Sequence, residues 1–468
     1  MPLALQFLQV SPHSPVLYNF HASPGLRRER VVTRTTSCAV PQVTVIGAGA
    51  AGLTAAFFAA EAGAQVTLFE RQDQAGSKIL ISGGTRCNVL PMSVDLQRDF
   101  FTESSQSALR AIFASWSLDG CKEWLESQIG LPLATEADSS KLFPVSNSGK
   151  DVRDRLLSSC LDRGVKLKSG AGCSNLQRNK NHNWDLELAN GSHHEAKRVI
   201  LATGGMSFPR MGTDGTGHRM AQGLGHDLRP SYPALVPLRS SHPAGEQLAG
   251  VSLQGVGLEA RLPPQPASSS SQTRARKKVK RVKAERGGLL FTHRGLSGPA
   301  VLDMSHHAVI ALQRGLPQPA LQVNWLDRTE SEWLQLLQDP ARGTSTLMAS
   351  LQAAGGLPHR LAACLCSEAG SDPKVQLAQL AKPSRTRLVQ LLTSYSIPFT
   401  GHEGFAKAEV TGGGVSLSEI DAATMESRRH SNLYMCGEIL DVFGRIGGYN
   451  FYWAWLSGRL AGLSSLKP

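Results

Sequence analysis

The chain has 468 residues, of which 41% are hydrophobic and 18% are charged. This length accommodates two to four domains, and this composition excludes a globally disordered chain. Eight cysteines are too few for a disulfide scaffold, and neither a CxxC pair nor a Cys/His cluster with zinc spacing occurs, so we expect no metal site and a reducing compartment. The net charge of +12 is uneven, because eight Lys and Arg residues stand against one acid in 274–286.

Residues 1–40 are rich in Ser, Thr, Pro and Arg, and contain a single acid, Glu29. They lack the apolar core of a secretory signal, so their composition predicts an organellar transit peptide, with an untargeted disordered extension as the alternative. The single acid and the Ser/Thr-rich approach to Cys38 favour a chloroplast over a mitochondrion. The uncharged stretch 35–60 has the length of a membrane span, but Pro41 and three glycines interrupt it, so we expect no membrane span.

The first fold signal is a strand, a glycine-rich turn and a helix. Residues 43–46 are predicted to form a buried parallel strand, and the turn Gly47–Gly52 and an Ala-rich helix over 53–62 follow directly. A second predicted strand over 65–69 ends at Glu70. This order is the GxGxxG fingerprint of a βαβ dinucleotide-binding unit, with its acid in place.

Each glycine of the GxGxxG turn is expected to have its own physical role. Gly47 permits the tight turn, Gly49 lets the backbone approach a pyrophosphate, and Gly52 lets helix and strand pack closely. The helix N-terminus supplies free N–H groups and a partial positive charge for phosphates. Glu70 can accept hydrogen bonds from the ribose hydroxyls, which disfavours NADP in this pocket. An incidental Gly-rich turn is the alternative.

FAD and NAD share this fingerprint, so other segments must decide between them. Residues 199–205 are predicted to form a strand that leads into a Gly-Gly turn, and 433–438 a strand that ends in Gly437 and Glu438. An extended FAD needs contacts from such a late strand, whereas a compact NAD domain does not. We therefore expect FAD as the cofactor.

A rare string, KILISGGTRCN, occupies residues 78–88. Together with the segments above, it resembles the YhiN/BaiN-like family of NAD(P)/FAD-dependent oxidoreductases. The resemblance runs in family order from about 43 to 462, and its motifs are far more specific than GxGxxG. Its further segments are 143–146, 202–209, 289–300, 405–415 and 437–450.

The resemblance implies an α/β fold, with a Rossmann-like FAD-binding domain of glutathione-reductase type that is interrupted by an inserted β-rich plus helical domain. The FAD-binding domain would comprise residues 41–236 and 396–468. The β-rich part of the insert would span 237–326, and the helical part 327–395.

The resemblance also implies three candidate catalytic residues. Arg86 and Cys87 follow a Gly-Gly turn close to the isoalloxazine, where Arg86 can stabilise negative charge on reduced flavin or on a substrate carbonyl. A packed, inert thiol is the ordinary alternative for Cys87. His293 is a candidate proton donor, and a structural hydrogen bond is the commoner role for a single histidine.

The last segment, 447–450, precedes an aromatic helix, and such a loop can direct helix N–H groups at the flavin; an ordinary helix start capped by Asn450 is the alternative. Glu438 and Asp441 are expected to bind ribityl or phosphate-linked hydroxyls. The full set of expected cofactor contacts is Gly47, Gly49, Ala51, Gly52, Glu70, Arg71, Lys78, Gly84, Arg86, Cys87, Asn88, Cys173, Thr203, Gly204, Gly437, Glu438, Asp441, Gly448, Tyr449 and Asn450.

Two of these expectations concern the adenine end of the cofactor. Cys173 would flank the adenine, although packing alone also explains a thiol at that position. Thr216 stands where the family has an acid, and Asp214 lies two residues earlier. This departure puts in doubt any contact carried over from the family's acid.

We expect a flavin-dependent reductase that takes electrons from NAD(P)H and reduces a polarised C=C bond, in a small molecule or in RNA, by hydride transfer from the flavin N5. A narrower alternative is the reduction of uracil in RNA, because its C5=C6 bond is conjugated to a carbonyl and the basic run 274–286 would hold phosphates. A solvated loop is the alternative for that run, since no aromatic residues are interleaved with its charges. A non-catalytic flavin-bearing RNA-binding factor and an oxidase of small amines or alcohols also stay open.

Overall fold

The computed structural model describes residues 40–136, 141–241, 245–264, 279–284 and 286–466. The transit peptide expected over 1–40 therefore lies outside the described residues, apart from Val40. The same holds for 274–278 and 285 of the basic run. Among the described residues, no helix combines the length and apolar character that crossing a bilayer requires.

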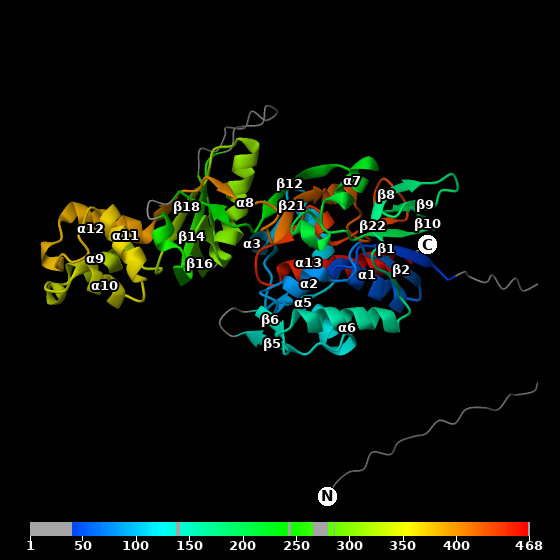
Figure 1. Ribbon diagram of the computed structural model, residues 1–468, viewed down its shortest axis with the longest axis horizontal. Helices are drawn as coiled ribbons and strands as arrows, with labels where there is room; N and C mark the ends of the chain where they lie inside the picture. Colours follow the sequence, from blue (N-terminus) through cyan, green and yellow to red (C-terminus); the bar gives the residue numbers. More distant parts are fainter. Residues whose placement is uncertain (1–39, 137–140, 242–244, 265–278, 285, 467–468) are drawn as a thin grey trace, which may run out of the picture. The chain divides into compact units, whose positions relative to one another are not determined.

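A five-stranded parallel sheet, in the order β22–β11–β1–β2–β7, forms the framework of the first part of the fold (Figure 1). Because β1 is central, the glycine-rich turn that follows it lies beside the turns that follow β2 and β11. The strands are β1 (Gln42–Ile46), β2 (Gln65–Phe69), β7 (Lys166–Lys168), β11 (Val199–Leu201) and β22 (Leu433–Met435).

Helix α1 (Ala50–Glu61) packs closely against α13 (Tyr449–Ser464), the last helix of the chain. Glycines make this approach possible, because a Cβ on Gly458 would lie 2.5 Å from the carbonyl oxygen of Ala51. Gly462 approaches the α1 backbone equally closely, at 2.5 Å. The C-terminal segment is thereby brought against the GxGxxG unit.

The other elements of this part are short and border the ends of the parallel strands. A three-stranded antiparallel sheet consists of β8 (Cys173–Arg178), β9 (Trp184–Leu188) and β10 (His193–Ala196). The remaining helices are α2 (Ser77–Ile81), α3 (Leu96–Asp99), α4 (Gln106–Phe113), α5 (Leu118–Glu123), α6 (Gly149–Asp162) and α7 (Thr216–Gly223). The remaining strands are β3 (Leu90–Pro91), β4 (Phe100–Phe101), β5 (Leu133–Glu136), β6 (Lys141–Pro144), β12 (Leu228–Ala234), β21 (Val410–Val415) and β23 (Phe443–Gly444).

The insert contains an eight-stranded sheet in the order β19–β18–β14–β16–β17–β13–β20, with β15 paired to β14. Helix α8 (Pro299–Arg314) packs on this sheet, so the part expected to be β-rich also holds a long helix. The strands are β13 (Leu238–Arg239), β14 (Ser252–Leu262), β15 (Lys280–Lys283), β16 (Gly287–Thr292), β17 (Gly295–Ser297), β18 (Ala320–Asn324), β19 (Tyr395–Ile397) and β20 (Gly401–His402).

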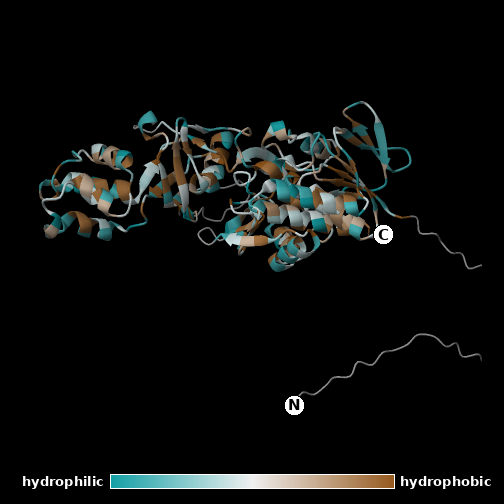
Figure 2. Ribbon diagram, turned by 60° about the horizontal axis from the view of Figure 1, so that its bottom comes forward, coloured by the Kyte–Doolittle hydropathy of each residue, from teal (hydrophilic) through white to brown (hydrophobic). Residues whose placement is uncertain are grey.

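A helical lobe completes the insert, and its helices carry hydrophobic and hydrophilic stretches side by side, as amphipathic helices do (Figure 2). Its buried residues belong to the same apolar core as the sheet, which extends from Leu238 to Phe399. Strand β19 crosses the boundary expected at 396 and pairs with β18. The helices are α9 (Glu330–Gln338), α10 (Leu347–Ala353), α11 (His359–Glu368) and α12 (Lys382–Thr393).

Candidate functional site

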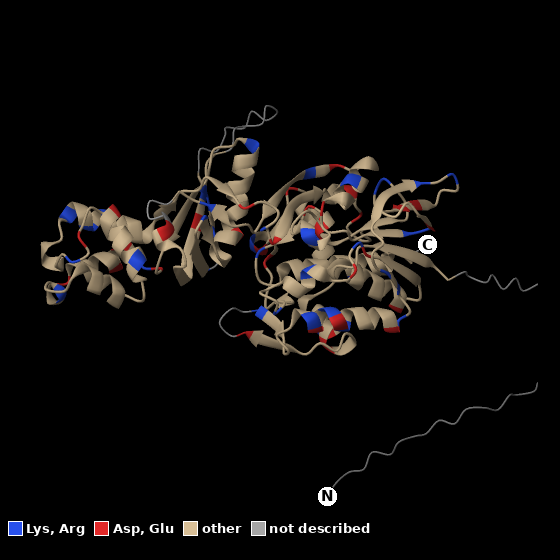
Figure 3. Ribbon diagram, viewed as in Figure 1, with Lys and Arg blue, Asp and Glu red and all other residues tan. Residues whose placement is uncertain are grey.

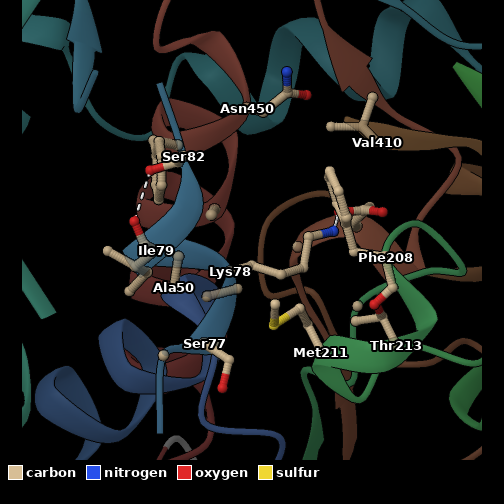
Figure 4. A pocket seen from close by; sticks show the side chains of 18 of the residues that line it. Ala50, Ser77, Lys78, Ile79, Ser82, Phe208, Met211, Thr213, Val410 and Asn450 are labelled. Carbon is tan, nitrogen blue, oxygen red and sulfur yellow. Dashed lines mark hydrogen bonds and ion pairs between the residues drawn. The ribbon is translucent and has the colours of Figure 1, made fainter. Parts of the chain in front are cut away.

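A cavity of about 540 Å³ lies at the carboxyl ends of the parallel strands. Its walls come from the turns after β1 and β11, from α2, from the loop before α7, and from the start of α13. In Figure 4, Lys78 reaches across this cavity from α2, and Phe208, Met211 and Thr213 lie on the opposite side. Segments far apart in the sequence therefore form one continuous site of a size that suits an organic cofactor.

The glycine-rich turn provides a backbone cradle at one wall. Gly47 has a φ of +100°, and a Cβ there would lie 2.5 Å from the carbonyl oxygen of Ala202. A Cβ on Gly52 would lie 1.8 Å from the carbonyl oxygen of Gly47. At Gly49, by contrast, a Cβ would meet no protein atom within 4 Å, so the open side of this residue, which lines the cavity, leaves room for phosphate at the N-terminus of α1.

Glu70 and Arg71 line the end of the cavity that follows β2. Glu70 accepts hydrogen bonds from the backbone N–H of Ala48 at 2.8 Å and of Gln72 at 2.9 Å, which fixes its carboxylate beside the glycine turn. Arg71 forms an ion pair with Asp214 and donates to the Thr216 hydroxyl at 2.9 Å.

Asp214 also accepts a hydrogen bond from the Thr216 backbone N–H, at 3.0 Å, at the start of α7. Burial opposes ionisation, but the hydrogen bonds from Thr216 and Arg71 prevail and lower the pKa of Asp214 to about 2. Asp214, two residues before Thr216, thus supplies a negative charge at this wall. Thr216, which stands where the family has an acid, contributes a hydroxyl there instead.

A Lys78–Glu438 ion pair joins two walls in the middle of the cavity. The Lys78 ammonium donates to Glu438 at 2.8 Å and to the Ser207 hydroxyl at 2.7 Å. Glu438 also accepts from the Thr411 backbone N–H at 3.0 Å. Burial alone would raise the pKa of Glu438, but the Lys78 charge and these hydrogen bonds hold it below its usual range. Glu438 is therefore an ionised acceptor, suited to ligand hydroxyls.

Arg86 and the start of α13 form the other end of the cavity. The Arg86 guanidinium donates to Asn147 at 3.0 Å, pairs with Glu136 at 2.9 Å, and lies 4.2 Å from the centre of the Phe143 ring. Gly448 is the N-cap of α13 with a φ of +87°, and it lines the cavity, so the N-terminus of this helix lies at the cavity wall.

The family of this chain follows from comparison with known proteins. The profile of the HI0933-like protein Rossmann domain matches residues 41–464, which is most of the chain. The chain belongs to this family of FAD-dependent oxidoreductases. Membership of this family confirms the expected α/β fold with a Rossmann-like FAD-binding domain and the expected FAD cofactor.

Three of the proteins that resemble this chain are two curated relatives and one solved structure. Ribosomal RNA dihydrouridine synthase of Escherichia coli is 32% identical over 431 residues, covering 88% of this chain and 95% of that protein. The 3-dehydro-bile acid delta(4,6)-reductase of Clostridium scindens is 29% identical over 430 residues, covering 91% and 99%. The open conformation of a flavocytochrome c3 fumarate reductase has a TM-score of 0.45 at 17% identity, covering 92% of this chain and 78% of that one.

FAD fits the residues of this family member's cavity. Gly49 leaves an open side at a helix N-terminus, which suits the pyrophosphate. Glu70 and Arg71 would hold the adenosine end of FAD, Lys78 and Glu438 its middle, and the N-terminus of α13 its flavin end. Of the expected contacts, those that line the cavity are Gly47, Gly49, Ala51, Glu70, Arg71, Lys78, Gly84, Arg86, Asn88, Cys173, Thr203, Gly204, Gly437, Glu438, Gly448 and Asn450.

Two of the three candidate catalytic residues do not line the cavity. Cys87 is fully buried, and burial raises the pKa of its thiol to about 12, so this thiol stays protonated at neutral pH. His293 is exposed in the turn between β16 and β17 of the insert. The catalytic roles of Cys87 and His293 stay predictions without support from the cavity geometry, whereas Arg86 lines the cavity.

Three other expected cofactor contacts, Gly52, Asp441 and Tyr449, do not line the cavity either. Gly52 faces the backbone of Gly47, as close helix–strand packing requires. One carboxylate oxygen of Asp441, Oδ2, accepts hydrogen bonds from the Thr102 and Ser104 hydroxyls and from the Glu103 backbone N–H. The Tyr449 hydroxyl accepts a hydrogen bond from the buried Arg445 guanidinium at 2.7 Å.

Asn450 does line the cavity, but it does not cap α13. Its side chain accepts from the Gly444 backbone N–H at 2.7 Å and donates to the Gly444 carbonyl oxygen at 2.8 Å, which braces the preceding loop. Glu409 and Lys141 line the cavity too, and the sequence analysis did not single them out. The sequence contains a feature that could have identified Glu409, because this residue is the one acid in the family-specific segment 405–415.

Proposed function

We propose that this flavoprotein reduces a C=C bond conjugated to a carbonyl, that its substrate is a uracil base in ribosomal RNA, and that NAD(P)H is the donor. The observation that carries the proposal is the similarity, along 88% of the chain, to a protein named ribosomal RNA dihydrouridine synthase. Dihydrouridine is uridine with two hydrogens added across C5=C6. One hydride equivalent and one proton are therefore required per base, and NAD(P)H is oxidised to NAD(P)⁺.

FAD, when bound, supplies the two-electron chemistry that connects such a donor to such an acceptor. Arg86 suits the carbonyl side of the reaction, because its guanidinium is permanently charged and Asn147, Glu136 and Phe143 fix its position. It orients and polarises a carbonyl oxygen but does not transfer a proton.

Glu409 is the better candidate to hold a proton. It lines the same cavity, and its side chain is exposed to the open space there. Desolvation by the surrounding walls raises the pKa of its carboxyl, against the opposing charge of Lys78. A carboxyl that holds its proton more tightly than usual is suited to general acid catalysis. Replacing Glu409 by Gln should therefore lower turnover while Arg86 and the flavin remain in place.

The test compares ribosomal RNA from cells with and without the protein, with dihydrouridine measured by mass spectrometry. We expect one or more dihydrouridines to disappear without the protein and to return with wild type. Arg86→Gln should restore less modification at equal flavin content, whereas Arg110→Gln, an exposed arginine of α4, serves as the matched control. Unchanged dihydrouridine would refute the RNA substrate, and turnover of a small enone by the same preparation would then favour the small-molecule reductase.

We also propose that the protein works in an organelle, a chloroplast in preference to a mitochondrion. The support is the composition of residues 1–40, which are rich in Ser, Thr, Pro and Arg and contain one acid. Fusing these residues to a fluorescent protein tests the proposal. Cytosolic fluorescence would refute it, and mitochondrial fluorescence would correct the organelle.

A further inference from the structure

The insert sheet has one covered face and one exposed face. Residues Leu253, Val256, Leu258 and Ala260 of β14 are buried in the core that also contains residues of α8. The positions between them, from Ser252 to Arg261, are exposed or half-buried. Side chains alternate between the two faces of a strand, so these positions share the second face. Figure 3 shows charged positions on the strands of this sheet.

Strand β15 adds the described part of the basic run to this exposed face. Arg281 pairs directly with Arg261 of β14, and Lys283 pairs with Glu259, so all four side chains share one face. Arg261 donates to Glu259 at 2.9 Å, and Arg281 lies 3.8 Å from the same carboxylate. One acid is thus shared by two arginines, and Lys283 adds a further positive charge.

The same arrangement recurs farther along the sheet. Arg239 of β13 lies 3.4 Å from Glu403, and Arg294 lies 3.5 Å from the same carboxylate. Both arginine side chains remain largely exposed, at 54% and 72%. Together with Ser240 and Thr400, they line a surface hollow. Arg294 belongs to the same turn as His293. The specific segment 289–300, which does not line the cavity, therefore contributes to this surface hollow.

We propose that two clusters of this sheet, Arg261, Arg281 and Lys283 toward one end of β14 and Arg239 and Arg294 toward the other, bind the phosphate backbone of folded RNA. The two clusters together are called the basic face below. The inference rests on the proposed function, which makes RNA the substrate. Each shared acid neutralises one arginine and holds two guanidinium groups in place, and planar guanidinium groups match phosphate oxygens.

The composition of the basic face favours folded RNA over single strands. Single-strand binding sites combine positive charge with aromatic side chains on which bases stack. The residues that line the surface hollow are Arg239, Ser240, Arg294 and Thr400, which offer charge and hydroxyl groups and no aromatic ring. Charge and hydroxyl groups recognise the backbone of a double-helical RNA, whose deep major groove excludes side chains.

The experiment measures binding of the flavin-loaded full chain to a fluorescent ribosomal RNA hairpin across a range of salt concentrations. Two double variants remove charge from the basic face: Arg261→Gln with Arg281→Gln, and Arg239→Gln with Arg294→Gln. The matched control is Lys150→Gln with Arg155→Gln on α6, because these residues are also exposed and also paired with acids. Flavin absorbance and unfolding temperature confirm that each variant is folded and loaded.

Each basic-face variant should lose about tenfold or more in affinity at low salt, and the slope of log affinity against log salt should fall by about two, since each phosphate contact contributes about 0.9. The control should bind like wild type. An unchanged slope in the basic-face variants, an equal loss in the control, or tighter binding of a single-stranded RNA would each overturn the proposal. Equally tight binding of anionic lipid vesicles would also overturn it, in favour of a membrane surface.

This outcome is separable from that of the proposed function. If the hairpin binds through the basic face but cellular dihydrouridine is unaffected by loss of the protein, the proposed reaction fails and the surface stands. If dihydrouridine disappears but the basic-face variants bind like wild type, the reaction stands and the surface fails.

Discussion

At the scale of single residues, Gly49 shows how one missing side chain leaves room for a cofactor. Its φ of −78° is accessible to any residue, so the backbone itself does not require glycine. Its open side meets no protein atom within 4 Å and lines the cavity. Gly49→Val should therefore fold but lose bound FAD, because the new side chain occupies the space beside the N-terminus of α1. Visible flavin absorbance after purification measures this loss.

A second glycine provides the control for this substitution. Gly223 at the end of α7 also has free space around its Cβ position and lies outside the cavity lining. Gly223→Val should keep the wild-type flavin content, since it adds the same side chain elsewhere. A Gly49→Val protein with full flavin content would show that the cofactor does not approach this turn.

Asp441 gives a pH dependence that can be measured. This carboxyl is 1% exposed, and burial raises its pKa from 3.8 to about 6, although hydrogen bonds from residues 102–104 oppose the shift. The native protein thus binds this proton more tightly than the unfolded chain does. The contribution of Asp441 to the free energy of unfolding is favourable below about pH 4 and is lost as the pH rises to about 6.

Asp441→Asn should remove this dependence. Relative to wild type, the variant should gain up to roughly 3 kcal/mol between pH 4 and pH 7, from about 1.36 kcal/mol per pKa unit. Denaturant unfolding at several pH values measures the difference. Ser104→Ala should raise the pH at which the Asp441 contribution is half lost, because the Ser104 hydroxyl donates to the Asp441 carboxylate at 2.7 Å and stabilises its charged form. Parallel pH profiles for Asp441→Asn and wild type would contradict this account.

At the scale of elements, the loop between β23 and α13 positions the helix start that faces the flavin. Arg445 of this loop is buried and donates to Asp99 of α3 at 2.7 Å. The next residue, Ile446, donates its backbone N–H to Asp303 of α8 at 2.7 Å. Two elements outside the loop, one of them in the insert, therefore hold the backbone that leads into Gly447 and Gly448.

Asp99→Asn should destabilise the protein by about 3–5 kcal/mol, because it removes a carboxylate that pairs with the buried Arg445 guanidinium. It should also weaken FAD binding, since the start of α13 loses its support. Unfolding curves and flavin titration measure the two effects. For comparison, the exposed Lys150–Asp154 pair on α6 should contribute less than about 1 kcal/mol when Lys150→Ala breaks it. Equal effects for both pairs would mean that the Arg445 loop does not depend on Asp99.

At the scale of the whole molecule, the sequence predicts local units such as the βαβ unit well. It predicts the contacts between segments that are distant in the sequence less well. The βαβ unit needs only periodicity and three glycines, so β1, α1 and β2 agree with the expected ranges to within a few residues. Glu438 was found because it ends a strand at the sheet edge where ligands bind in such folds. Asp441 is three residues farther, and nothing local shows that the loop 102–104 occupies its carboxylate.

His293 also shows that a local sequence motif does not reveal contacts with distant segments. Its neighbours form a specific motif, but the motif alone does not show whether it faces the flavin or the far side of an insert sheet. Strand β16, which ends just before His293, pairs with β14 and β17, and these pairings place the turn at the strand ends of that sheet. Pairings between distant segments are set by the packing of the whole insert core, so they are not readable from a short motif.

Two large apolar cores predict how the whole molecule responds to cofactor removal. One core contains residues between Val43 and Ala221 and between Val415 and Ala461, and the other extends from Leu238 to Phe399. The described residues that line the cavity belong to the first part of the fold, and none comes from 238–399. FAD at 100 times its dissociation constant stabilises its host by about 2.7 kcal/mol, which raises the unfolding temperature of that part by roughly 5–10 °C.

Calorimetry of the protein with and without FAD should therefore show one transition that moves and one, from the insert, that does not. Gly49→Val protein should show neither transition moving on addition of FAD, since it lacks the room for phosphate. A single transition that shifts as a whole would instead mean that the small apolar cluster linking α8 to β12 and β21, which includes Tyr232, Leu302 and Val410, couples the two cores into one cooperative unit.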